Sequence, residues 1–131
     1  MLDGKRIMVV EDEALLALDL SLTLEDEGAT VAGPYHQLER AMKGDTGPVD
    51  AAILDVDLAG VPVFPLADEL HAKGIPIVFH TGRANLEELR TRYGAARIVT
   101  KPSLPEEVTR TVEAVIANAN TAPPNGASAA E

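Results

Sequence analysis

Cysteine is absent from this 131-residue sequence, and aromatic residues make up only 3% of it. The missing cysteine excludes disulfides, thiolate metal sites and cysteine nucleophiles. Hydrophobic residues still account for 46% of the chain, so the interior must be built mainly from Leu, Ile, Val and Ala. A chain of this length and composition fits one compact domain with a single core.

Positive charge is also scarce. The 11 Lys and Arg residues are outnumbered by 21 Asp and Glu, which gives a formal net charge of -10. A protein that binds a nucleic-acid backbone needs a basic surface, so we expect no nucleic-acid partner, whereas an acidic pocket would attract metal cations. No apolar run is long enough for a signal peptide or a membrane span. We therefore expect a cytoplasmic protein with no membrane contact.

Short apolar runs alternate along the chain with segments of helical periodicity. The expected strands are residues 5–10, 29–33, 51–55, 75–80 and 96–100, and the expected helices are residues 13–27, 35–43, 64–73, 84–92 and 104–118. Such alternation is typical of a parallel sheet covered by helices on both faces. We predict an α/β fold with a doubly wound, five-stranded parallel sheet in the order 2-1-3-4-5.

Two features mark the end of the domain. Ser103 and Glu106 have the spacing of a capping box, and Pro105 is tolerated in the first turn of the helix that follows. Residues 119–131, ANTAPPNGASAAE, contain two prolines and small polar residues with nothing to bury. We expect residues 1–118 to form the folded domain and residues 119–131 to be a disordered C-terminal tail.

Polar residues follow the apolar strands where each strand ends. Glu11 and Asp12 end the first strand, Asp55 the third, Thr81 the fourth and Lys101 the fifth. Ligands of such sheets bind at the carboxyl ends of the strands, so we expect these side chains around one cavity. Several carboxylates in one pocket need a compensating cation, and Mg²⁺ suits oxygen ligands. An Asp beside a metal ion, an ammonium and a hydroxyl group can accept a phosphoryl group.

Four short motifs carry a resemblance to a known family. VVEDE (9–13), ILDVDL (53–58), FHTG (79–82) and TKP (100–102) resemble, in order and spacing, the signature blocks of bacterial two-component response-regulator receiver domains. The resemblance covers residues 5–118 and implies a flavodoxin-like (βα)5 three-layer sandwich. FHTG is similar to a subgroup of single-domain regulators whose fourth strand reads Phe-Ala-Thr-Gly, with His80 in place of the Ala.

The resemblance also implies a role for each residue of the acidic group. Asp55 would be the phospho-acceptor, and Thr81 and Lys101 would contact the phosphoryl oxygens. The Mg²⁺ ligands that the resemblance implies are Glu11, Asp12, Asp55 and the backbone carbonyl of Asp57.

Three positions depart from the family's pattern or vary within it. Many receivers carry Tyr or Phe three residues before the Lys as part of a switch with the Thr; this chain has Ile98, so the switch involving Thr81 lacks its aromatic partner. Asp57 and Arg83 occupy the positions that, in the family, lie beside the path of the hydrolytic water. We expect these two side chains to form an ion pair that slows hydrolysis of the phosphoryl group.

The first helix carries two rows of leucines. Leu15, Leu18 and Leu22 share one face, and a second row lies nearly opposite, made of Leu16, Leu20 and Leu24. A helix packed only on the sheet does not need the second row. We expect the second row to be an exposed strip that docks the helical bundle presenting the phospho-His; the alternative is that both rows are covered within the domain.

The sequence predicts a stand-alone receiver of a two-component phosphorelay, a monomer or weak dimer that catalyses its own phosphorylation and dephosphorylation without being a conventional enzyme. Its partners would be a histidine kinase or His-phosphotransfer protein and a downstream protein target, unless it serves as a phosphate sink. A small phosphohydrolase with an Asp nucleophile is one alternative, and a pseudo-receiver that only binds is another. His36, His71 and His80 have no metal-ligand spacing, so we expect surface or structural roles for them.

Overall fold

The computed structural model describes residues 2–44, 47–82 and 86–121. The strands are β1 (Arg6–Val10), β2 (Thr30–Tyr35), β3 (Ala51–Leu54), β4 (Asp57–Leu58), β5 (Val61–Pro62), β6 (Ile77–Thr81) and β7 (Arg97–Thr100). The helices are α1 (Ala14–Asp26), α2 (Leu38–Lys43), α3 (Phe64–Ala72), α4 (Leu86–Arg92) and α5 (Pro105–Thr121). Within the described residues, no helix combines the length and the apolar composition needed to cross a bilayer.

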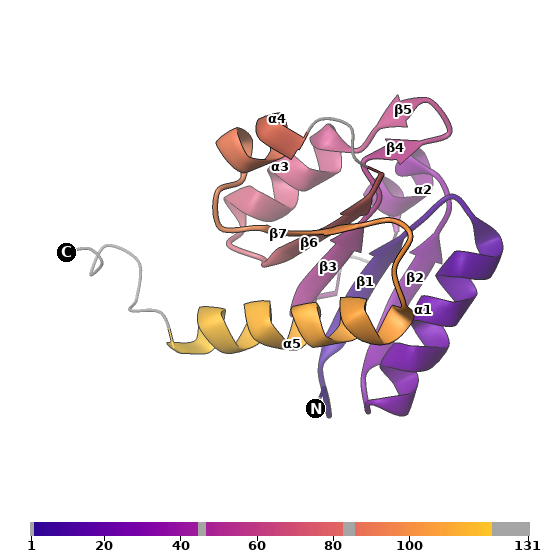
Figure 1. The fold of residues 1–131 in the computed structure, drawn as a ribbon, viewed down its shortest axis with the longest axis vertical. Helices are drawn as coiled ribbons and strands as arrows, with labels where there is room; N and C mark the ends of the chain where they lie inside the picture. The colour runs from indigo at the N-terminus through magenta and orange to yellow at the C-terminus, as the bar shows by residue number, and fades with distance from the viewer. Residues whose placement is uncertain (1, 45–46, 83–85, 122–131) are drawn as a thin grey trace.

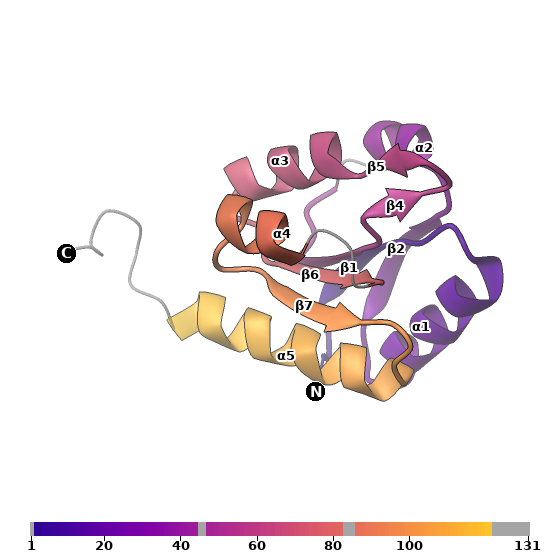
Figure 2. The same cartoon turned by 45° about the horizontal axis from the view of Figure 1, so that its top comes forward.

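Five of the strands form one parallel sheet in the order β2-β1-β3-β6-β7. Figures 1 and 2 show α1 and α5 on one face of this sheet and α2, α3 and α4 on the other. The strands that come fourth and fifth in this sheet along the chain are β6 and β7, so the predicted order 2-1-3-4-5 and the doubly wound three-layer architecture are confirmed.

Alternate residues of the central strands fill two separate cores. In β1, Ile7 and Val9 pack in the core under α1 and α5, whereas Met8 and Val10 pack in the core under the other helices. Because both faces of the sheet are covered, the strands read as unbroken apolar runs and not as an alternation of apolar and polar residues. The carboxyl ends of the strands consequently carry the first polar residues after each run.

The orientation of α1 corrects the predicted docking strip. Leu20 and Leu24 are fully buried, so the prediction that they form an exposed strip with Leu16 was wrong. The buried stripe of α1 is Ala17, Leu20, Ser21 and Leu24, whose spacing fits one helix face. Two small residues complete this stripe, which is why counting leucines alone selected the wrong face.

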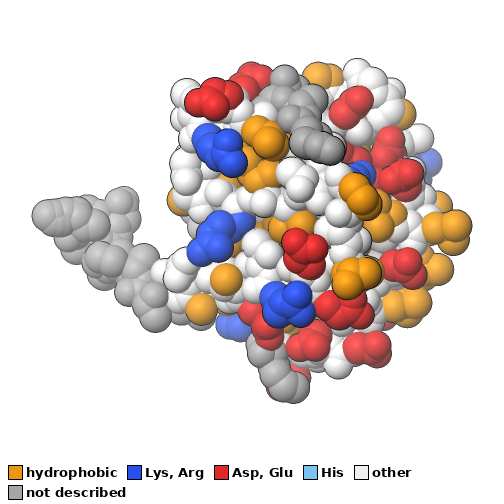
Figure 3. All heavy atoms as spheres, viewed as in Figure 1, with side chains coloured by type: hydrophobic (Ala, Val, Ile, Leu, Met, Phe, Trp, Pro, Cys, Tyr) orange, Lys and Arg blue, Asp and Glu red, His pale blue; other side chains and the backbone are white. Residues whose placement is uncertain are grey.

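The opposite row of α1 faces solvent instead. Leu15, Leu18 and Leu22 are 80%, 50% and 51% exposed. Figure 3 shows hydrophobic side chains at the surface over α1, at the right of the view, with acidic side chains beside them. The molecule therefore does present an apolar row on this helix, on the face that the sequence assigned to the sheet.

A short hairpin, β4–β5, follows β3 and was not predicted from the sequence. Its two-residue turn, Ala59-Gly60, has φ angles of 56° and 90°. Both turn positions therefore lie in the left-handed region, where Asn-Gly or Gly-Gly is the usual signal. An Ala in the first position hides the turn from a sequence reading.

The last helix begins at Pro105 and continues to Thr121, three residues beyond its expected end. Residues 122–131 lie outside the described residues, so the disorder of the tail stays a prediction. Because the helix begins at Pro105, Ser103 lies one residue before the cap position, and its hydroxyl group is 2.8 Å from His80 Nε2. The predicted capping box is thus replaced by a contact with β6.

Candidate functional site

Strand pairing brings the polar residues of β1 and β3 together. Val10 and Leu54 are partners in the register of the two strands, and the amide of Asp55 donates a hydrogen bond to the Val10 carbonyl over 3.0 Å. The residues that follow Val10 therefore leave the sheet beside Asp55. Glu11 and Asp12 are those residues, at the carboxyl end of the sheet where ligands bind in this architecture.

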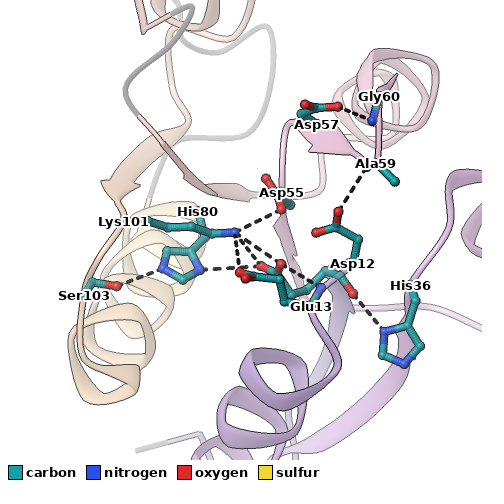
Figure 4. Close-up of polar contacts among 11 residues, drawn as sticks. Asp12, Glu13, His36, Asp55, Asp57, Ala59, Gly60, His80, Lys101 and Ser103 are labelled. Atoms are coloured by element: carbon teal, nitrogen blue, oxygen red, sulfur yellow. Dashed lines mark hydrogen bonds and ion pairs between the residues drawn. The ribbon is translucent and has the colours of Figure 1, made fainter.

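Lys101 enters the same place from the end of β7, and Figure 4 shows its side chain extending toward the acidic group. Its ammonium donates a hydrogen bond to Asp55 Oδ2 over 3.0 Å and lies 3.1 Å from Glu11 Oε1. Glu11 and Asp55 are only 1% and 5% exposed. One ammonium therefore serves two buried carboxylates, and no second Lys or Arg of the described residues pairs with them.

The carboxylates fit a divalent cation. One oxygen from each of Glu11, Asp12 and Asp55 lies within 4.8 Å of the others. Glu11 Oε1 is buried and accepts no hydrogen bond, and its one charged contact is the ion pair with Lys101, so it can also take a cation or a water bound to one. Hard carboxylate oxygens suit Mg²⁺ better than a softer metal.

The protonation equilibria of the pocket reflect the same shortage of positive charge. Burial, followed by the charge of Asp55, raises the pKa of Glu11 to about 7. Burial also raises the pKa of Asp55, although the hydrogen bond and charge of Lys101 oppose the shift. The pKa of Lys101 is raised in spite of burial, because Asp55 and Glu11 stabilise its charged form. A bound cation would favour the ionised state of both carboxyls.

Thr81 is the last residue of β6 and is 5% exposed. Its carbonyl accepts a hydrogen bond of 2.7 Å from the amide of Lys101, and it is paired with Thr100 in the register of β6 and β7. The backbone thus fixes Thr81 and Lys101 next to each other on the rim that carries Asp55.

The hairpin closes another side of the pocket. The amide of Ala59 donates a hydrogen bond of 3.0 Å to Asp12 Oδ2, and the amide of Gly60 donates one of 2.7 Å to Asp57 Oδ1. The Asp57 side chain is exposed. Arg83 lies outside the described residues, so its ion pair with Asp57 stays a prediction.

Ile98, which replaces the switch aromatic, lies in β7 and is half-buried. It packs against the core that contains Phe79 and Tyr93. Aromatic rings are therefore present near this strand, but they come from β6 and from the residue after α4.

Two histidines lie beside Glu11. His80 is buried in β6, with its Nδ1 atom 4.0 Å from Glu11 Oε1. His36 Nδ1 is 2.9 Å from the Glu11 carbonyl oxygen. The sequence suggested surface or structural roles for both. The place of His80 in an apolar strand, directly before Thr81, was a signal that it lies near the site. No comparable signal was available for His36.

Comparisons with known proteins agree with this geometry. A family model described as "Response regulator receiver domain" matches residues 7–113. The curated relative TcrA of Mycobacterium tuberculosis, a transcriptional regulatory protein, is 32% identical over 103 residues, which are 76% of this chain and 41% of that protein. The chain spans between 41% and 52% of the length of the curated relatives it matches.

Solved receiver structures have the same fold. The non-phosphorylated receiver domain of HemR from Leptospira biflexa is 28% identical with a TM-score of 0.75, covering 86% of this chain and 94% of that one. SdrG from Sphingomonas melonis is 33% identical with a TM-score of 0.71, covering 86% of this chain and 96% of that one.

Proposed function

Because the chain belongs to the response regulator receiver domain family, we propose that it accepts a phosphoryl group on Asp55 from a histidine kinase or a His-phosphotransfer protein. Receiver domains are signalling modules and not conventional enzymes, which favours this proposal over the phosphohydrolase alternative. The observation that carries the proposal is the contact of the Lys101 ammonium with both Asp55 and Glu11, since a binding-only module would need none of this arrangement.

The chemistry follows from the charges of the pocket. Lys101 holds Asp55 as a carboxylate, so an oxygen lone pair attacks phosphorus while the bond from phosphorus to the donor's imidazole nitrogen breaks. The electron pair of that bond stays on the imidazole, and no proton has to be moved by Asp55. Lys101 and the Thr81 hydroxyl would contact the phosphoryl oxygens, where charge develops.

A divalent ion would be held by Glu11, Asp12, Asp55 and the backbone carbonyl of Asp57. Bound there, Mg²⁺ would neutralise negative charge on the transferring oxygens. Hydrolysis of the phosphoryl group would return the protein to its starting state, and the predicted pair of Asp57 and Arg83 would slow this step by obstructing water.

The donor has to approach the rim that carries Asp55, and α1 begins on that rim. Its exposed row of Leu15, Leu18 and Leu22 starts four residues after Glu11. A helical bundle presenting phospho-His could cover this row and reach Asp55 at once. We therefore assign the docking role to these three leucines, in place of the buried row predicted from the sequence.

The downstream event would be a protein contact. Phosphorylation of Asp55 would draw Thr81 toward the phosphoryl group and change the surface formed by β6, α4 and β7. With Ile98 in place of the aromatic residue, this change cannot use the usual inward swing of a ring from that position. A role as phosphate sink would need no such surface change.

The proposal is tested by incubating the protein with acetyl phosphate and Mg²⁺ and measuring its intact mass. We expect a gain of one phosphoryl group in the wild type and in Asp19→Asn, a matched carboxyl-to-amide change on the exposed side of α1. We expect none in Asp55→Asn or in the wild type with EDTA. An unmodified wild type, or a modified Asp55→Asn, would overturn the proposal.

A further inference from the structure

Two buried polar atoms face each other beside the acceptor site without a hydrogen bond. His80 and Glu11 are each 1% exposed. His80 Nδ1 and Glu11 Oε1 make no hydrogen bond and lie 4.0 Å apart. Buried polar atoms that make no hydrogen bond are costly and need an explanation, and Glu11 Oε1 has only its ion pair with Lys101, at 3.1 Å.

The other ring nitrogen of His80 has a partner. His80 Nε2 lies 2.8 Å from the Ser103 hydroxyl, which can donate to it. In a neutral imidazole one nitrogen accepts and the other carries the proton. A hydroxyl donating to Nε2 therefore leaves the proton on Nδ1, the atom that faces the Glu11 carboxylate. Burial and the nearby Lys101 lower the pKa of His80 to about 4, which keeps the ring neutral at physiological pH.

Lys101 is the present partner of Glu11, at 3.1 Å from Oε1 and 3.2 Å from Oε2. The proposed function requires the same ammonium to contact the phosphoryl group on Asp55. Once Lys101 turns to those oxygens, the Glu11 carboxylate loses this ion pair while remaining buried, and the metal ion of the proposed function would be its one remaining charged contact. His80 Nδ1 is the nearby donor already aimed at the carboxylate.

We propose that His80 is a positioning residue that secures the Glu11 carboxylate, by donating a hydrogen bond from Nδ1 to Oε1, when Lys101 turns to the phosphoryl group. This inference rests on the proposed function. A movement of about 1 Å brings the two atoms to hydrogen-bond distance. Ser103 acts through His80 by fixing the position of the ring proton. Removing a group that orients a metal ligand in this way typically lowers the metal affinity by about 10- to 100-fold.

Matched variants separate the hydrogen bond from simple packing. His80→Asn keeps an N–H donor near the position of Nδ1, whereas His80→Leu has a comparable bulk and no donor. We expect His80→Leu to weaken Mg²⁺ binding in the presence of beryllofluoride roughly tenfold, measured by calorimetry, and His80→Asn to stay close to the wild type. Ser21→Ala, which removes a buried hydroxyl group of α1, is the control and should not differ from the wild type.

A measurement on the wild type needs no variant to fold. Long-range ¹H–¹⁵N correlation spectra report which ring nitrogen of His80 carries the proton. We expect the Nδ1–H form, with its proton shifting downfield when Mg²⁺ and beryllofluoride are added. A ring protonated on Nε2, or equal Mg²⁺ affinities of His80→Leu and the wild type, would overturn the role of His80 even if Asp55 is phosphorylated. A wild type that acquires no phosphoryl group would instead overturn the proposed function.

Discussion

At the scale of single residues, the site is short of positive charge. Lys101 is shared between Asp55 and Glu11, and Asp12 adds a third carboxylate within reach. Burial and mutual repulsion destabilise these three carboxylates, and a bound cation offsets that cost. The burial and the charge of Asp55 that raise the pKa of Glu11 therefore also favour the binding of Mg²⁺.

The raised pKa of Glu11 predicts how pH changes the effect of a substitution. In metal-free buffer the folded protein keeps a proton on Glu11 up to about pH 7, whereas the unfolded chain releases it near 4.5. Between these pH values the unfolded chain is ionised at Glu11 while the folded protein is not, which favours the unfolded chain, so the stability of the fold falls as pH rises. Glu11→Gln has no carboxyl group to titrate at this position. As the pH rises from 4.5 to about 7, the unfolding free energy of the variant should therefore increase relative to that of the wild type by about 3 kcal/mol.

Chemical denaturation of both proteins at several pH values measures this difference. Saturating Mg²⁺ should abolish this relative stabilisation of Glu11→Gln. The ion stabilises the wild type by binding its ionised Glu11, and the variant has no such ligand. A pH-independent difference between the two proteins in metal-free buffer would contradict the charge shortage described for the pocket.

At the scale of elements, α1 shows what periodicity can and cannot decide. The leucine spacing correctly indicated a helix with two apolar faces. The leucine spacing could not decide which face packs on the sheet. The buried stripe is completed by Ala17 and Ser21, which contribute little to a hydrophobic pattern because they are small. Small residues allow close approach to the sheet and α5, and the larger leucines are left outside.

Substitutions in α1 should separate stability from docking. Leu20→Ala removes a fully buried side chain and should lower the unfolding free energy by about 2–5 kcal/mol. Leu18→Ala, on the exposed row, should change it by no more than about 0.5 kcal/mol. Phosphotransfer from the cognate kinase should be slowed by Leu18→Ala while acetyl phosphate still modifies Asp55; unchanged transfer by the kinase would remove the docking assignment.

A second contact between elements joins α3 to the end of α4. The buried Tyr93 donates a hydrogen bond from its hydroxyl group to Asp68 Oδ1, and Arg92 lies 3.1 Å from Asp68 Oδ2. The Tyr93 ring also packs against Phe79, with ring centres 5.3 Å apart. These contacts tie the α4 end of the proposed output surface to the core.

Removing only the hydroxyl group tests this connection. Tyr93→Phe keeps the ring packing and leaves Asp68 free to bind water, so we expect a loss of about 1 kcal/mol in unfolding free energy. Urea denaturation measures it. A loss as large as that of Leu20→Ala would show that Asp68 is much less accessible to water than its partial exposure indicates.

At the scale of the whole molecule, the architecture was predictable because it depends on regular signals. The alternation of runs gave five strands and five helices close to their observed bounds, and the polar ends of those runs gave the group of Glu11, Asp12, Asp55 and Lys101. The hairpin was missed because Ala59 is an unusual turn residue. The pairing of His80 with Ser103 was missed because it joins the ends of two elements that only the folded chain brings together.

The acidic site also predicts a response of the whole fold to metal. A cation that binds only the folded protein stabilises it, by about 2.7 kcal/mol at a concentration 100 times the dissociation constant. We expect Mg²⁺ to raise the melting temperature of the wild type, EDTA to reverse the rise, and Asp12→Asn to reduce it. An equal rise in Asp12→Asn would place the ion elsewhere on this acidic surface.

The central claim is that Asp55 is the residue that carries the phosphoryl group. Borohydride reduction converts an aspartyl phosphate to homoserine, and peptide mass spectrometry then locates the modified position. After incubation with acetyl phosphate and Mg²⁺, we predict homoserine at position 55 alone, and none when EDTA is present. Homoserine at another carboxyl, or its absence from a protein that has gained a phosphoryl group, would contradict the account.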